Sequence, residues 1–153
     1  MDIASAGQYL SFNLAGAAYA VPIGMVREIN RVLLITPMPE TPDYVCGVMN
    51  LRGNMIPIID LKLRFGMSRG PITKQSCIIV AETPAGLCGM LVDSILGVVT
   101  LTTDNIEPRP SLSRNDKSTC VNGMGRAGET IFILIDIPQV VTAALTFNLQ
   151  GAA

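Results

Sequence analysis

The stretch Gly47-Val-Met-Asn-Leu-Arg-Gly-Asn-Met-Ile-Pro-Ile-Ile-Asp-Leu61 sets the expected fold. Its two short apolar runs, Gly47–Leu51 and Met55–Ile59, are typical of strands. The segment Arg52-Gly53-Asn54 between them predicts a tight turn. Asp60 follows the second run and is expected to cap a short helix through its side-chain oxygens. The sequence therefore predicts a β-hairpin followed by a short helix.

The same order of features occurs again near the end of the chain. Residues 123–136 repeat the glycine-led run, the turn, the returning apolar run and the final aspartate. Upstream, residues 9–21 followed by Val26 resemble residues 76–90 followed by Ile95. Such a restart indicates two similar β units. A single hairpin is marginally stable, so about five short strands per unit are expected to form a small barrel.

The two units set the expected domain organisation. We expect a single domain over 8–147, with one barrel at about 15–66, the other at about 75–136, and terminal segments that can cross between them. Each unit is too small for a large core of its own. The barrels are therefore expected to share an apolar interface, and the groove between them is a natural binding site.

Composition excludes several classes of function. The 153 residues are 49% hydrophobic and 15% charged, with a formal net charge of -1, so a packed core is expected and apolar surface remains for partners. Lysine and arginine are scattered, which argues against a nucleic-acid groove and a polybasic membrane patch. The absence of histidine excludes histidine-based catalysis and zinc sites that use histidine. No metal or cofactor is expected.

The cysteines and two long apolar stretches have ordinary explanations. Cys46, Cys77 and Cys88 lie in apolar runs, and we interpret them as buried thiols rather than disulfide partners. Residues 3–26 lack the positive start of a signal peptide, and residues 84–103 carry a charge at their middle. Both stretches are therefore interpreted as buried strands, without direct membrane insertion, and the protein is expected to be cytoplasmic.

The segment Gly47–Leu61 resembles the signature of the CheW-like chemotaxis coupling family, which reads G-x-x-N-L-R-G-x-x-x-P-[VI]-[VI]-D-L. The runs Tyr9–Leu14, Tyr19–Ile23, Gly89–Asp93 and Ile131–Asp136 also fit this family, so the resemblance covers about 8–141. It implies two SH3-like five-stranded barrels with a few short helices. It also implies a non-enzymatic adaptor that couples the cytoplasmic tip of a methyl-accepting chemotaxis receptor to the regulatory domain of the histidine kinase CheA. Association with membrane-bound receptor arrays, and self-association in rings, follow from the same resemblance.

The resemblance implies a receptor-binding groove formed by Val26, Glu28, Arg52, Ile95 and Val98. Judged by the residues alone, Arg52 is either a solvated turn arginine or a guanidinium that pairs with a partner carboxylate. Glu28 would be an ordinary exposed acid on a short helical turn that begins after Pro22. Ile95 and Val98 would equally suit a strand core.

A second set of residues is expected at the kinase or ring contact, and it comprises Met55, Ile56, Ile58, Glu107 and Leu112. The first three would form an apolar strand edge. Glu107 stands where the family can carry a basic residue, which either weakens the ring contact or requires a compensating partner charge. Three glycines, Gly47, Gly53 and Gly89, are assigned to structural turns and close approaches.

Other classes of function compete with this interpretation. An enzyme using cysteine or aspartate lacks a nucleophile motif, and Asp60, Asp93 and Asp136 are explained as caps. An oligonucleotide-binding barrel would need clustered basic and aromatic residues, whereas aromatic residues make up 5% and tryptophan is absent. A paralogous coupler for twitching or another chemosensory output fits the sequence as well as a chemotaxis coupler does.

Overall fold

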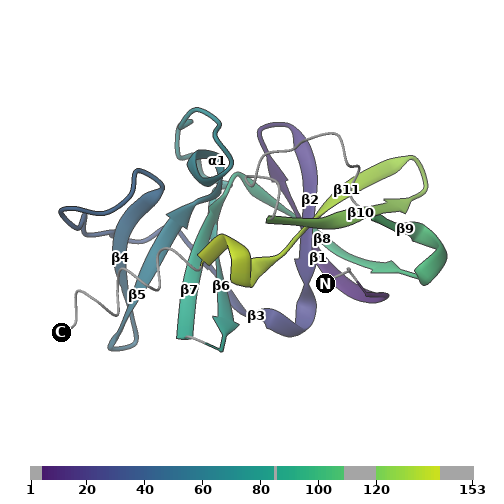
Figure 1. Ribbon diagram of the computed structural model, residues 1–153. Coiled ribbons are helices and arrows are strands. Elements are labelled where there is room, and N and C mark those ends of the chain that lie inside the picture. Colours follow the sequence, from purple (N-terminus) through teal and green to yellow (C-terminus); the bar gives the residue numbers. More distant parts are fainter. Residues whose placement is uncertain (1–4, 85, 109–119, 142–153) are drawn as a thin grey trace.

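The computed structural model describes residues 5–84, 86–108 and 120–141. Within these residues the strands form two sheets, one of six strands and one of five (Figure 1). The six-stranded sheet contains, in spatial order, β8 (Ser94–Leu101), β1 (Gly7–Leu14), β2 (Ala17–Pro22), β11 (Thr130–Ile135), β10 (Val121–Ala127) and β9 (Ile106–Pro108). The five-stranded sheet contains β3 (Val26–Arg31), β6 (Cys77–Thr83), β7 (Gly86–Val92), β5 (Asn54–Asp60) and β4 (Val45–Leu51). The short helices are η1 (Ile23–Met25), α1 (Leu61–Arg64) and η2 (Thr103–Asn105).

The sheets divide the chain into a continuous part and a split part. The five-stranded sheet uses residues 26–92, which we call the continuous barrel. The six-stranded sheet uses residues 7–22, 94–108 and 121–135, which we call the split barrel. This architecture confirms the all-β prediction. The strand pairing places the boundaries elsewhere than the expected ranges 15–66 and 75–136.

The boundaries differ because the two repeated units exchange their first hairpins. The β1–β2 hairpin pairs with β8 and, in parallel, with β11 of the second unit. The β6–β7 hairpin of the second unit pairs with β3 and, in parallel, with β5 of the first unit. Each barrel is therefore completed by a hairpin from the other repeat, a long-range arrangement that local sequence patterns do not report.

The repeat extends to irregularities in the strands. A register shift between Val45 and Gly47 on β4 has its counterpart between Val121 and Gly123 on β10. In each case one strand carries an extra residue opposite its partner, which bends the strand. The shared position of these bulges supports the prediction of two similar units.

Among the described residues the core forms three clusters, and the largest joins the two barrels. Strand β6 shows the arrangement: Ile79 and Ala81 belong to the shared cluster, whereas Ile78 and Val80 fill the inside of the continuous barrel. On β1, Leu10, Phe12 and Leu14 face the shared cluster. The opposite face is also covered: Tyr9 and Ser11 are each 4% exposed. It is covered because the split barrel closes over it.

The predicted helix after the signature stretch is confirmed. The Asp60 carboxylate accepts hydrogen bonds from the backbone N–H groups of Lys62, at 3.0 Å, and Leu63, at 3.4 Å, which caps α1. Residues 137–141 form a further helical turn after β11. Among the residues that the structure describes, no helix is both long and apolar enough to cross a membrane.

Candidate partner-binding surface

Two of the predicted groove residues, Val26 and Ile95, lie on edge strands of the two sheets, beside the shared cluster. Val26 on β3 is paired with Ala81, and Ile95 on β8 is paired with Phe12. Directly paired residues share a face of a sheet, so both side chains are on the face that meets the other barrel. Both also pack against the shared cluster.

Val98 extends this apolar edge into solvent. It is paired with Leu10 on β1, and it is 57% exposed. Its neighbour Leu96, at the bulge of β8, is 56% exposed. On the opposite barrel Ile29 is 42% exposed and lies across from Ile79. Exposed aliphatic side chains on both edges make a surface suited to an apolar partner.

Glu28 and Arg52 form an ion pair at the mouth of the continuous barrel. The Glu28 side chain is 24% exposed and that of Arg52 is 70% exposed. The hydrogen bond from Arg52 is the main cause that lowers the pKa of the Glu28 carboxyl, and Asn30 and Arg27 act in the same direction. Glu28 is therefore ionised at neutral pH. This pair is brought together across 24 residues of sequence.

The expected helical turn at Val26 and Glu28 is wrong. Only Ile23–Met25 is helical, as a single 3-10 turn, and both residues lie on β3. An extra residue, Arg27, stands at the register shift between Val26 and Glu28. Because of this bulge, Val26 and Ile29 share one face of the strand although they are three residues apart, a spacing that also fits a helix.

Arg52 sits in a strained position. Leu51 is paired with Asn54, which leaves Arg52 and Gly53 as a two-residue hairpin turn. Their φ angles are 51° and 89°, as a type I′ turn requires. The Gly53 N–H also donates to the Asn50 side chain at 2.9 Å. An arginine in the left-handed region costs about 1 kcal/mol relative to glycine, so its presence here favours a role for its side chain.

Gly47 and Gly89 stand at close approaches. A Cβ atom on Gly47, which has φ 143°, would lie 2.1 Å from the carbonyl oxygen of Thr36. Thr36 is bridged to Val48 by two backbone hydrogen bonds, of 2.8 and 2.9 Å, and these join the chain after β3 to β4. A Cβ on Gly89 would meet the Ile58 side chain at 2.5 Å. The geometry thus supports structural assignments for both glycines.

The predicted kinase-contact residues do not share one surface. Met55 is 60% exposed at the start of β5. Ile56 and Ile58 are 1% and 0% exposed inside the continuous barrel. The expectation that all three form a strand edge is wrong, because β5 lies between β7 and β4 within the sheet.

The other two predicted contact residues, Glu107 and Leu112, come later in the sequence. Glu107 on β9 is exposed and its carboxylate is 3.9 Å from the Arg126 guanidinium of the neighbouring strand β10. This contact is exposed and long, so it is a weak one. Leu112 lies outside the described residues.

The thiols do not resemble those of a cysteine enzyme. All four cysteines are free. Burial raises the pKa of Cys46 to about 11 and that of Cys88 to about 12, and burial also raises the pKa of Cys120. These three side chains are therefore protonated at neutral pH, whereas the nucleophile of a cysteine enzyme is the thiolate.

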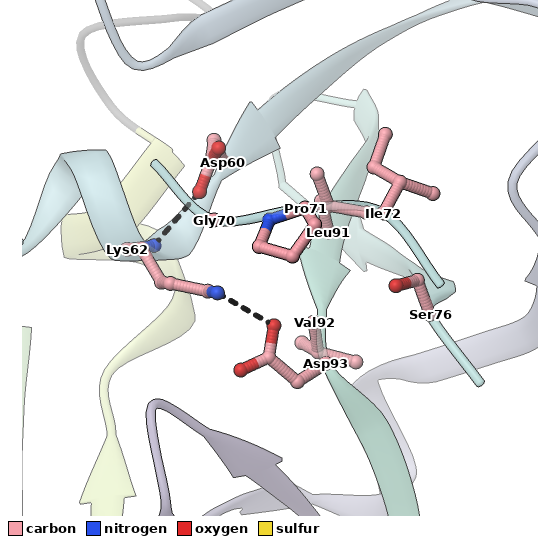
Figure 2. A pocket seen from close by; sticks show the side chains of 9 residues that line it. All are labelled: Asp60, Lys62, Gly70, Pro71, Ile72, Ser76, Leu91, Val92 and Asp93. Carbon is pink, nitrogen blue, oxygen red and sulfur yellow. Dashed lines mark hydrogen bonds and ion pairs between the residues drawn. The ribbon is translucent and has the colours of Figure 1, made fainter. Parts of the chain in front are cut away.

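The sequence interpretation missed a polar junction between the barrels. Figure 2 shows Lys62, on α1, reaching the carboxylate of Asp93, with a distance of 2.9 Å between the Lys62 Nζ and Asp93 Oδ1 atoms. The sequence pattern explains Asp93 only as a cap. The signal that could have found the junction is that Asp93 is the single charge within the apolar stretch 84–103, since a charge among buried strands requires a partner.

The two joined barrels, with exposed aliphatic edges and an ion pair beside them, define the class of protein as a binding scaffold. A family model described as the CheW-like domain matches residues 8–145, so the chain belongs to the CheW-like domain family. The chain is 32% identical to the chemotaxis protein CheW of Klebsiella aerogenes, over 89% of this chain and 82% of that protein. It is also 32% identical to the chemotaxis protein CheW of Rhizobium meliloti, over 87% of this chain and 86% of that protein.

A solved structure has the same fold as this chain. The crystal structure of the scaffolding protein TtCheW from Thermoanaerobacter tengcongensis superposes with a TM-score of 0.79 at 34% identity, covering 86% of this chain and 89% of that one. These findings confirm the predicted family and the predicted fold of two SH3-like barrels. The chain is a chemotaxis adaptor, as predicted, and not an enzyme.

Proposed function

We propose that this adaptor couples the cytoplasmic tip of a methyl-accepting chemotaxis receptor to the regulatory domain of the histidine kinase CheA. The receptor tip binds where the edge strands β3 and β8 flank the shared cluster. The observation that carries this proposal is the combination of exposed aliphatic edges with an ion-paired arginine in a strained turn. Apolar contacts supply affinity at such a surface, and the charged pair fixes orientation.

The apolar part of this surface suits a helix. Helices bind into apolar grooves through aliphatic side chains spaced along one face. Val26 and Ile95 are half-buried against the shared cluster, whereas Val98 is exposed. A partner helix would therefore contact both half-buried and exposed aliphatic side chains. Arg52, with its guanidinium largely exposed, remains able to donate to a partner carboxylate or carbonyl while it holds Glu28.

The kinase contact is proposed elsewhere, at Met55 and around Glu107. Met55 offers an exposed, adaptable apolar side chain. Glu107 can exchange its long contact with Arg126 for a basic group on the partner, because the pair is exposed and 3.9 Å apart. Leu112 is also proposed as a residue of the kinase contact. Binding of both partners would place the protein in receptor arrays at the membrane, with self-association in rings.

Charge reversal at Arg52 tests the receptor site. Arg52→Glu places two carboxylates at the barrel mouth and removes the donor, so we expect loss of capture by a purified receptor tip while the circular dichroism spectrum is unchanged. The matched control is Arg126→Glu, which also turns an exposed Arg–Glu pair into a Glu–Glu pair, but on β10. Receptor capture should survive in the control. Unchanged capture by Arg52→Glu, with a folded protein, would refute the proposed site.

A further inference from the structure

We propose that α1 is a latch between the two barrels, and that Lys62, Arg64 and Asp93 are positioning residues that fix the relative placement of the two barrels. The second half of this inference, that the latch sets the spacing between the β3 and β8 edges for receptor binding, rests on the proposed function. The first half concerns only the relative orientation of the barrels.

Asp93 occupies a crossing point of the chain. It is the single residue between β7 of the continuous barrel and β8 of the split barrel. Its backbone N–H donates to the carbonyl of Asn13 at 3.1 Å, and its Oδ2 accepts from the N–H of Ala15 at 2.9 Å. Asn13 and Ala15 belong to the β1–β2 hairpin of the split barrel. One aspartate therefore joins the crossing to a hairpin 78 residues earlier in the chain.

The other carboxylate oxygen of Asp93 reaches the continuous barrel. Lys62 Nζ lies 2.9 Å from Asp93 Oδ1, and Figure 2 shows the lysine pointing from α1 toward the aspartate. The lysine is confined, since a Cβ on Gly70 would be 2.5 Å from its Nζ. The side chains of Lys62 and Asp93 are only 15% and 27% exposed. Such a pair is screened by salt much less than an exposed one.

Arg64 makes the second contact of the latch. Its guanidinium donates to the backbone carbonyls of Val140 and Gln139, each at 3.0 Å. Both carbonyls belong to the helical turn 137–141, which follows β11 of the split barrel. The guanidinium also lies over the ring of Tyr44, 5.2 Å from its centroid, a cation–π contact within the continuous barrel. Two basic residues on one turn of helix thus hold Asp93, at the start of the split barrel's β8, and the helical turn that follows its β11.

The latch lies next to residues of the proposed receptor surface. Ser94 and Ile95 follow Asp93 directly, so anchoring Asp93 fixes the start of β8. The other crossing between the barrels is η1, which leads into Val26 and has no side-chain cap hydrogen bond. A rotation of one barrel against the other would change the separation of Val26 and Ile95. The polar restraint against that rotation comes from α1.

Residual dipolar couplings of the full-length chain measure the relative orientation of the barrels directly. We would compare Asp93→Asn, which keeps an acceptor for Ala15 but removes the ion pair, with the double variant Lys62→Met/Arg64→Met. Glu82→Gln is the control, because it removes the Arg27–Glu82 pair that joins β3 and β6 within the continuous barrel. Two independent latch variants keep the test valid if one of them fails to fold.

We expect the couplings within each barrel to fit the wild-type structure in every variant. In the latch variants, one alignment tensor should no longer fit both barrels, and receptor-tip affinity should fall about tenfold. A single tensor that fits both barrels in both latch variants would overturn the latch. Altered orientation with unchanged receptor affinity would overturn its role in positioning. A wild-type chain that does not bind the receptor tip would instead refute the proposed function, because the orientation measurement needs no receptor.

Discussion

Glu28 on β3 and Arg52 in the β4–β5 turn form an ion pair between the two edge strands of the five-stranded sheet. Together with the Thr36–Val48 bridge, this contact connects the two edges of the continuous barrel. At the corresponding places the split barrel carries Gly97, after the bulge of β8, and Gly128, in the β10–β11 turn. The charged pair therefore distinguishes the continuous barrel from the otherwise similar split barrel. The two barrels of the adaptor thus present different surfaces at equivalent positions.

The ion pair makes a specific prediction about pH. Because Arg52 lowers the pKa of Glu28 in the folded protein, the pair stabilises the fold above the usual glutamate pKa of about 4.3. That contribution is lost as the pH falls through the lower, folded value. We expect the Glu28 carboxyl carbon, followed by NMR, to titrate below the usual range and to move upward in Arg52→Ala. An Arg52→Ala midpoint equal to that of the wild type would show that the pair does not exist in solution.

Gly47 should be among the least replaceable residues of the continuous barrel. Gly47→Ala places a methyl group against the Thr36 carbonyl and requires a residue with a side chain to adopt φ 143°. The combined overlap and strain should lower the free energy of unfolding by about 3 kcal/mol or more. Urea denaturation measures this loss.

Gly24→Ala is the matched control for that prediction. Gly24 is exposed, and a Cβ atom added there would have no neighbouring atom within 4 Å, so the change should stay within about 0.5 kcal/mol. Equal losses in the two variants would mean that the Thr36–Val48 bridge is not formed as described.

Met55 and Ile58 both lie on β5, but substitutions at the two positions should have different effects, because Met55 is exposed and Ile58 is buried. Ile58→Ala removes atoms from the sealed inside of the continuous barrel and should destabilise the protein by about 2–5 kcal/mol. Met55→Ala affects an exposed side chain and should change stability by less than about 0.5 kcal/mol, while it weakens capture by the kinase regulatory domain. Normal kinase capture by Met55→Ala would remove Met55 from the contact.

Much of the local structure could be predicted from the sequence, because it depends on neighbouring residues. The Arg52-Gly53 turn and the Asp60 cap are each set within a few positions of the chain. Cys88 is buried, as its place in an apolar run predicts, whereas Cys46 and Cys77, interpreted in the same way, are only half-buried. The family signature lies in this same local segment, so the class of function could be inferred with it.

The rest depends on contacts between distant segments. The exchange of hairpins between the repeats pairs β1 with β8 and β3 with β6, and no short-range pattern reports such a partner. The Arg27 bulge gives Val26 and Ile29 a helical spacing on a strand. The pairing of Glu28 with Arg52, and of Lys62 with Asp93, likewise needed the folded chain.

Binding of the receptor tip across the edges of both barrels is the central proposal for function, and methyl NMR observes it at single residues. A purified receptor tip would be titrated into the protein carrying ¹³C-labelled valine, isoleucine and methionine methyl groups. We expect the largest shifts at Val26, Ile95 and Val98. Shifts confined to exposed methyl groups elsewhere, such as those of Met55 and Ile131, would contradict this mode of binding.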